Sequence, residues 1–89
     1  MGSHIVRAVL RHAQGGKCCY CGVSMIQWKH KTGARIPPKA ETVEHLRRRA
    51  DGGGNTRDNL ALACRECNQG RGLTDWLTYK SYRMGELTL

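Results

Sequence analysis

The stretch Thr42–Gly72, TVEHLRRRADGGGNTRDNLALACRECNQGRG, decides how this chain folds. It begins with a β-branched pair that leads into an acidic residue and a histidine, and it continues through a glycine-rich turn into a second apolar run. Short β-branched or apolar runs bounded by glycine-rich segments are typical of strands. We therefore expect strands at Glu41–Leu46 and Leu60–Ala63, a loop over Arg47–Asp58 between them, and a short helix at Arg65–Arg71.

Two Cys-x-x-Cys pairs, Cys18–Cys21 and Cys64–Cys67, flank the predicted strands. Four thiolates at this spacing form a complete tetrahedral ligand set for structural zinc. Residues 22–63 separate the pairs, which is a longer interval than in a zinc ribbon, so a closed site has to enclose an inserted element. We predict one structural Zn²⁺ that pins both ends of the strand–loop–strand unit. Because sulfur fills all four positions, this ion is not expected to be the catalyst.

Other interpretations of the cysteines stay open at this point. The pairs could form disulfides, or one pair could be a thioredoxin-like redox site, although no βαβ pattern surrounds either of them. Gly22 suits the tight backbone turn of a zinc knuckle, which favours the metal. Cys19 is the thiol left over, and we expect it to be structural.

Helices are predicted on both sides of this core. Residues Ile5–Gln14 have helical periodicity and end at a Gly-Gly pair. Arg7 and Arg11 are expected on the outer side of this helix. The inner side is expected to carry the apolar residues Ile5, Val9 and Ala13, with Val6 and Leu10 beside them. A C-terminal helix is predicted to begin with Thr74 as its N-cap, and its aromatic side chains are expected to pack rather than stack on bases.

The segment Val23–Ala40 has no clear periodicity. We expect a loop or an irregular hairpin there, with extended backbone at Pro37 and Pro38. This segment lies between the first cysteine pair and the first strand, and its role is not indicated by the pattern.

The composition describes a small basic domain. The chain has 89 residues, with 15 Lys and Arg against 7 Asp and Glu, and a formal net charge of +8. We expect a single domain over residues 1–89, in which residues 1–4 look like an expression scar. No apolar run has the length of a membrane span, so we expect no membrane partner and a cytoplasmic protein of a bacterial or phage-infected cell. The charge favours a nucleic-acid partner without separating a binder from a nuclease.

Taken together, these elements resemble the HNH endonuclease family, whose core is a ββα-metal unit. The shared motifs are Cys-x-Tyr-Cys-Gly within Lys17–Gly22, and Val-Glu-His, Gly-Gly-x-Asn, Asp-Asn-Leu and Cys-x-x-Cys-Asn-x-x-x-Gly within Thr42–Gly72. The motifs occur in the family's order and cover about half of the chain. The resemblance implies a zinc-stapled α+β domain, with N- and C-terminal helices around the ββα-metal core, that acts as a metal-dependent DNA endonuclease.

The reactive residues follow from the chemistry and from this resemblance. An imidazole of ordinary pKa is the side chain best suited to take a proton from water near neutral pH, so His45 is the expected general base. The resemblance makes Glu44 and Asn68 the ligands of a catalytic ion, although Glu44 differs from the Asp or His commonest at its position. Two oxygen donors suit Mg²⁺ or Mn²⁺ better than Zn²⁺. Asn59 matches the family's central asparagine, which holds the loop and orients the histidine.

The expected DNA contacts are basic side chains around these residues, namely Arg47, Arg48, Arg49, Arg57, Arg65 and Arg71. Most should bind backbone phosphates, with Arg65 and Arg71 nearest the scissile bond. Because one small module covers few base pairs, extended sequence recognition would need a homodimer or a partner subunit. The alternative function is a non-catalytic zinc module that binds nucleic acid through charge alone.

Overall fold

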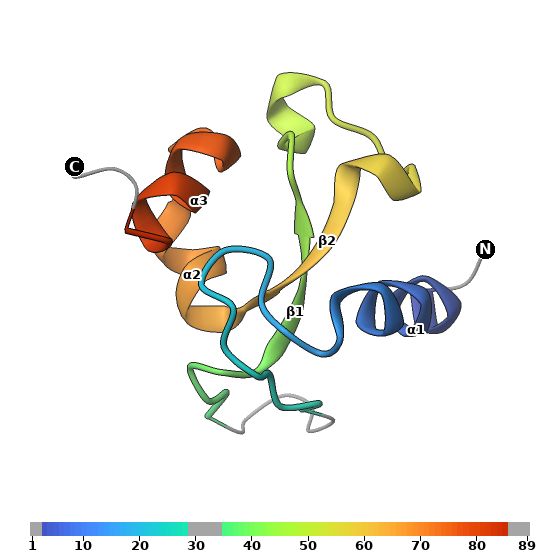
Figure 1. Ribbon diagram of the computed structural model, residues 1–89. Coiled ribbons are helices and arrows are strands. Elements are labelled where there is room, and N and C mark those ends of the chain that lie inside the picture. Colours follow the sequence, from blue (N-terminus) through green and yellow to red (C-terminus); the bar gives the residue numbers. More distant parts are fainter. Residues whose placement is uncertain (1–2, 29–34, 86–89) are drawn as a thin grey trace.

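A two-stranded antiparallel sheet lies at the centre of the chain, with α1 on one side and α2 and α3 on the other (Figure 1). The structure, a computed structural model, describes residues 3–28 and 35–85, so part of the predicted Val23–Ala40 loop lies outside it. Its elements are α1 (Ser3–Gln14), β1 (Glu41–His45), two 3₁₀ turns (Arg49–Asp51 and Arg57–Asn59), β2 (Leu60–Cys64), α2 (Arg65–Arg71) and α3 (Trp76–Arg83). The predicted small α+β fold is confirmed.

The sheet pairs the two segments that the sequence predicts as strands. Glu41 of β1 lies opposite Cys64 of β2, and His45 lies opposite Leu60. The β2 strand is buried along its whole length, which explains its uninterrupted apolar sequence. This pairing places the Glu44–His45 end of β1 directly beside the end of the loop that joins the strands.

The inward face of α1 differs from the predicted one. Leu10 is buried and Val6 packs beside it against Leu60 and Leu62, whereas Ile5 is 56 % exposed. Val6 and Leu10, which were expected only beside the inner side, are therefore the residues that pack inward. The predicted inner face of α1 is wrong.

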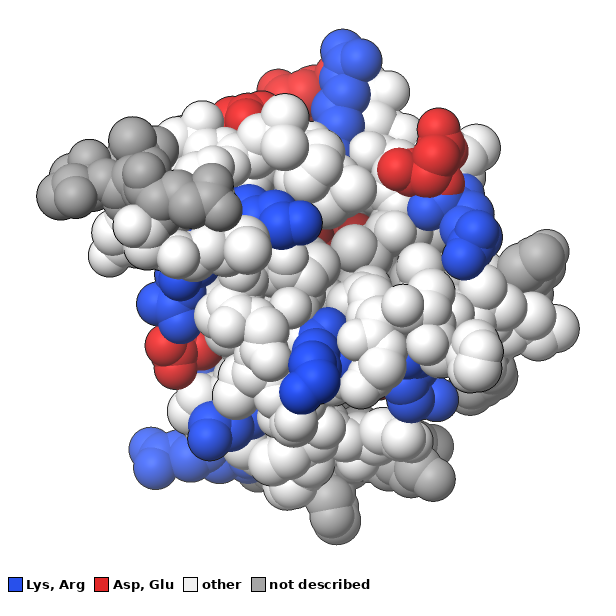
Figure 2. Space-filling view, viewed as in Figure 1, with Lys and Arg blue, Asp and Glu red and all other residues white. Residues whose placement is uncertain are grey.

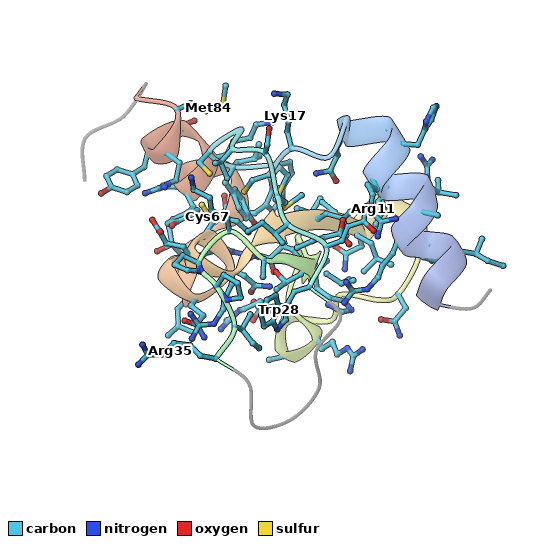
Figure 3. All side chains as sticks on the ribbon, turned by 90° about the horizontal axis from the view of Figure 1, so that it is seen from below. Arg11, Lys17, Trp28, Arg35, Cys67 and Met84 are labelled. Carbon is cyan, nitrogen blue, oxygen red and sulfur yellow. The ribbon has the colours of Figure 1, made fainter. Side chains whose placement is uncertain are left out.

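The reason is a buried carboxylate on β1. Glu41 is 6 % exposed, and its oxygens accept hydrogen bonds at 2.8 Å from Nε and Nη2 of Arg11, with Arg7 at 3.5 Å. An unpaired buried charge is far costlier than an exposed isoleucine, so the helix turns its arginines inward. Arg11 projects from α1 toward the strands in the view of Figure 3. The prediction that these arginines face outward is wrong for the same reason.

Gln14, at the end of α1, docks on the middle of β2. Its Nε2 donates to the carbonyl oxygen of Leu62 at 2.9 Å, and its Oε1 accepts from the Leu62 N–H at 2.8 Å. The backbone N–H of Cys19 donates to the same carbonyl at 3.0 Å. The helix and the first cysteine segment are thereby tied to one strand residue.

The predicted extended backbone at Pro37 and Pro38 is replaced by a turn. The Ala40 N–H donates to the Pro37 carbonyl at 3.1 Å, with Pro38 at the turn position that its fixed φ favours. The carbonyls of Pro38 and Ala40 then accept from the N–H groups of Glu66 and Arg65 at 3.0 and 2.9 Å. Helix α2 begins at these two residues, so the turn satisfies donors that the helix cannot pair internally.

The cap of α3 lies one residue later than predicted. Asp75 accepts from the N–H groups of Leu77 and Thr78 at 3.1 and 3.3 Å, so Asp75 is the N-cap and the choice of Thr74 is wrong. A carboxylate bonds the free N–H groups of the first turn more strongly than a hydroxyl. From α3, Tyr79 packs edge-on against Tyr20, with ring centroids 5.1 Å apart.

None of the described helices is both long and apolar enough to cross a membrane.

Candidate functional site

The four predicted zinc ligands come together in the structure. Any two of the Sγ atoms of Cys18, Cys21, Cys64 and Cys67 lie within 4.8 Å of each other, and those of Cys21 and Cys64 are 3.9 Å apart. Three of the four side chains are buried, and Cys67 lies on α2 at the side of the molecule away from α1 (Figure 3). Gly22 takes a positive φ of 76°, as the tight knuckle turn requires.

The surroundings of these sulfurs fit a metal better than free thiols. The N–H groups of Tyr20 and Cys64 point at the Cys18 sulfur from 3.4 and 3.3 Å. Together with a hydrogen bond from the Cys19 thiol, which is the largest contribution, they lower the pKa of Cys18 to about 4. Burial raises the pKa of Cys64 to about 11 and raises that of Cys67 as well. Four closely packed sulfurs can become thiolates together only when a cation compensates them, and this all-sulfur set suits zinc.

A basic side chain lies beside this cluster. Contact with Cys21 raises the pKa of Arg83, and the Arg83 guanidinium also forms an ion pair with Glu66 at 3.5 Å. Four thiolates on a divalent cation carry excess negative charge, which a neighbouring guanidinium offsets. The four-cysteine cluster, with its basic neighbour, therefore indicates a structural metal such as zinc.

The second group of predicted site residues shares an open cavity of about 320 Å³. Glu44, His45 and Asn68 all line it. Three arginines line it as well, namely Arg48, Arg49 and Arg71. Residues from β1, the following loop and α2 thus meet at one place.

The remaining predicted DNA contacts lie away from this cavity. Arg47 lines a neighbouring cavity of about 350 Å³ with Leu46 and Trp76. Arg57 is exposed in the second 3₁₀ turn, and Arg65 is half-buried at the start of α2. On the face shown in Figure 2, basic side chains are spread among uncharged ones and do not merge into one continuous patch.

Glu44 is part of a buried polar network. Its side chain comes from the strand face opposite to that of Val43, and the residue is 6 % exposed. Its Oε2 accepts a hydrogen bond from the Tyr20 hydroxyl at 3.0 Å and lies 3.2 Å from Nη1 of Arg71. Burial and the nearby Glu44 charge raise the pKa of Tyr20, so its hydroxyl stays a donor. Within residues 3–28 and 35–85, Oε1 of Glu44 has no hydrogen-bond partner.

Arg71 joins this network to the backbone around the site. It is 6 % exposed and donates to the carbonyl oxygens of His45, Leu46 and Thr74 at 3.0, 2.7 and 2.8 Å. The Arg71 donors are thus directed to protein groups and hold the end of β1 against α2. Neither this role nor that of Tyr20 follows from the sequence pattern, because both contacts join residues far apart in the chain.

Asn68 is oriented by β1. Its Nδ2 donates to Oγ1 of Thr42 at 3.0 Å and to the carbonyl of Val43 at 3.4 Å. Thr42 in turn donates to the carbonyl of Ala63 at 2.7 Å, which fixes the hydroxyl as an acceptor for Asn68. Among the described residues no donor reaches Oδ1 of Asn68, so this carbonyl oxygen remains available as a ligand.

His45 contacts an asparagine that is not among the predicted site residues. Its Nε2 lies 2.7 Å from Oδ1 of Asn55, and the same oxygen accepts from Nη2 of Arg49 at 3.3 Å. Asn55 is the asparagine of the Gly-Gly-x-Asn motif, and its place in that motif was the one sequence signal that could have identified it as a site residue.

Asn59 holds the loop that carries Asn55. Its amide accepts from the Arg47 N–H at 2.8 Å and donates to the carbonyls of Arg47 and Gly54 at 3.0 and 2.8 Å. Gly53 lies under this amide: a Cβ there would be 2.9 Å from Nδ2 of Asn59 and would overlap the Arg47 carbonyl. The loop needs glycine at this position because the backbones approach so closely.

Comparison with known protein families agrees with this arrangement. The family model described as HNH endonuclease matches residues 18–72, which is more than half of the chain and includes both cysteine pairs and the cavity residues of β1 and α2. A search of curated proteins found no match. On the strength of the family match and of the four-cysteine cluster enclosed by it, the chain belongs to the HNH endonuclease family.

Proposed function

We propose that this protein is a metal-dependent DNA endonuclease that hydrolyses phosphodiester bonds. The family as a whole supports a nuclease-type activity. The single observation that carries the proposal is the meeting of Glu44, His45 and Asn68 in one open cavity that arginines line. A module that binds nucleic acid through charge alone does not require two oxygen atoms that are free to bind a metal ion, together with an imidazole, at one place.

His45 is the proposed general base. Phosphodiester hydrolysis needs a water molecule from which a proton is removed as the water attacks phosphorus. The imidazole is half-buried at the end of β1, lines the cavity, and is held by Asn55 at 2.7 Å. A side chain in this position can reach a water molecule inside the cavity while the strand keeps its backbone fixed.

Glu44 and Asn68 are the proposed protein ligands of the catalytic ion. Glu44 has Oε2 engaged by Tyr20 and offers Oε1, and Asn68 is oriented through Nδ2 and offers Oδ1. No described residue is hydrogen-bonded to either offered oxygen. An oxygen-only donor set fits Mg²⁺ or Mn²⁺. Such an ion, when bound, stabilises the negative charge that develops on the phosphate and on the leaving oxygen.

Arg48 and Arg49 are the proposed phosphate contacts at the cavity. Both line it, and both belong to the loop that follows the reactive end of β1. Guanidinium groups bind phosphate oxygens in forked geometry and position the backbone without reading base sequence. We assign Arg47, Arg57 and Arg65 to more distant phosphates. For Arg71 we propose a positioning role toward Glu44 beside any contact with DNA.

One observation favours the non-catalytic alternative. The ion pair with Arg71 already neutralises the Glu44 carboxylate, and a guanidinium 3.2 Å away repels an incoming cation. If this ion pair were permanent, the cavity would bind a phosphate through its arginines without cutting it. The two functions therefore differ in whether DNA is cleaved and not in whether it is bound.

Plasmid relaxation tests the proposal. Supercoiled plasmid is incubated with the zinc-loaded protein in Mg²⁺, in Mn²⁺ or without added divalent ion, and with His45→Ala in parallel. We expect nicked or linear product from the wild type with Mg²⁺ or Mn²⁺ only. Zinc is measured in every sample, because a chelator that strips the cysteine cluster would inactivate the protein by unfolding it. DNA binding without cleavage under all these conditions would establish the binding module.

A further inference from the structure

We infer that Asn55 is a positioning residue that fixes the tautomer of His45, so that Nε2 carries the proton and Nδ1 is the basic nitrogen. The importance of this contact for catalysis rests on the proposed function of His45 as a general base. The tautomer itself follows from hydrogen-bond geometry and can be tested without any cleavage of DNA.

The guanidinium of Arg49 has only hydrogen-bond donors. Its Nη2 lies 3.3 Å from one atom of the Asn55 amide, so that atom has to be the carbonyl oxygen. An amide turned the other way would place two donors against each other. The contact with Arg49 therefore establishes that the carbonyl oxygen of Asn55, and not its amide nitrogen, faces Arg49 and His45.

The same oxygen lies 2.7 Å from Nε2 of His45. A carbonyl oxygen accepts hydrogen bonds and cannot donate one, so Nε2 has to carry a proton. In a neutral imidazole the other ring nitrogen, Nδ1, then holds the lone pair. Among the described residues no group is hydrogen-bonded to Nδ1, which leaves this nitrogen able to accept a proton from water.

The loop that carries Asn55 is held firmly enough for this purpose. The Asn59 side chain accepts one hydrogen bond and donates two, and these three bonds hold the backbone on the two sides of the turn at Arg47 and Gly54. Gly53 allows the close approach on which these bonds depend. Asn59 thus acts on the loop, and Asn55 acts on the imidazole ring directly.

Nitrogen NMR of the zinc-loaded protein tests the tautomer. Ring ¹⁵N shifts of His45 are recorded at about pH 8.5, where free imidazole is neutral, and are assigned by their loss in His45→Gln. We expect a protonated Nε2 and an unprotonated Nδ1 in the wild type. Asn55→Asp keeps an acceptor and should keep this pattern, whereas Asn55→Ala should move both shifts toward a mixture of tautomers. Thr56→Ala, a change in the same loop at a side chain without a capping bond, is the control.

A proton on Nδ1 in the wild type would overturn the inference, and so would ring shifts that Asn55→Ala leaves unchanged. The wild-type spectrum decides the tautomer even where Asn55→Ala does not fold. In cleavage assays, Asn55→Ala should lower kcat about 10- to 100-fold with little change in KM, as is typical when a partner that orients a functional histidine is removed. Asn55→Asp should recover most of this loss. A wild type that cuts no DNA would refute the proposed function, and the NMR result would still judge the tautomer.

Discussion

The hydroxyl of Tyr20 donates a hydrogen bond to Oε2 of Glu44 across 3.0 Å. Tyr20 lies between Cys18 and Cys21 in the zinc knuckle, and Glu44 lines the cavity of the proposed active site. A single side chain therefore joins the four-cysteine cluster to the proposed ligand of the catalytic ion. Correct folding of the cysteine cluster sets the orientation of the carboxylate.

Tyr20→Phe tests this connection. The substitution removes the hydrogen bond that the hydroxyl donates to the buried Glu44 carboxylate and the one that it accepts from Nη1 of Arg71 at 3.3 Å. Loss of the bond to the carboxylate alone should lower the free energy of unfolding by about 1.5–3 kcal/mol. Zinc content should stay unchanged, because the four sulfurs are untouched. In urea unfolding and in Mn²⁺ titrations of cleavage, we expect lower stability and a higher Mn²⁺ requirement. If Tyr20→Phe and the wild type have equal stability and an equal Mn²⁺ requirement, the hydrogen bond from Tyr20 does not orient the Glu44 carboxylate.

Arg71→Met should be far more destabilising than a surface arginine change. It leaves the buried Glu44 carboxylate without its ion-pair partner, which typically costs about 3–5 kcal/mol. Arg57→Met, at an exposed arginine, is the matched control and should change stability little. Adding Glu44→Gln to Arg71→Met should recover part of the loss. Urea unfolding of the wild type, Arg71→Met, Glu44→Gln and the double variant measures the coupling, and purely additive effects would contradict it.

The cysteines should separate into two classes. Cys64→Ser or Cys67→Ser removes a metal ligand and should unfold the domain, because the free energy of metal binding is part of the folding free energy. Cys19→Ser keeps all four ligands and should keep both zinc and fold. Elemental analysis and circular dichroism measure these outcomes. A folded, active preparation without zinc would refute the structural metal.

His45→Ala and Asn68→Ala should lose cleavage for different reasons. Loss of a general base removes a factor of about 10²–10⁴ in rate, and added metal cannot replace it. Asn68→Ala weakens ion binding instead, so high Mn²⁺ should partly restore its activity. Plasmid cleavage across a Mn²⁺ series distinguishes the two, with DNA binding measured as a control for fold. Equal rescue of both variants by Mn²⁺ would contradict the assignment of roles.

The loop arginines should control the salt dependence of DNA binding. Each phosphate neutralised contributes about 0.9 log units of affinity per log unit of salt, so replacing Arg48 and Arg49 by Ala should reduce that slope. Lys17→Ala, at an exposed lysine that lines none of the cavities described above, is the control. Fluorescence anisotropy over a range of salt concentrations gives the slopes. Equal slopes for the arginine variant and the wild type would place these arginines away from the DNA.

Local patterns in the sequence were sufficient for much of the fold. The strands β1 and β2 and the helix α2 were predicted to within a residue at each end, because β-branched runs, glycine-rich turns and cysteine spacing act over short distances. The four metal ligands followed from the same spacing.

Contacts between distant residues escaped prediction. The rotation of α1 depends on Glu41, which is far from Arg11 in sequence, and nothing in the helix itself signals a buried carboxylate. The predicted cap Thr74 was wrong by one residue, because Thr74 and Asp75 are neighbours and both residue types cap helices. Asn55 and Asn59 are both loop asparagines, and only the folded loop shows which of them meets the imidazole.

The docking of Gln14 on Leu62 also bears on how copies of this protein can associate. An exposed strand edge is a template for pairing with another chain, which leads to dimers or to aggregates. Here a side-chain amide takes up both backbone groups at the middle of β2, as a neighbouring strand would. A second copy cannot extend the sheet across that edge without first displacing α1. Any dimer formed to lengthen the DNA contact therefore has to use another face of the molecule.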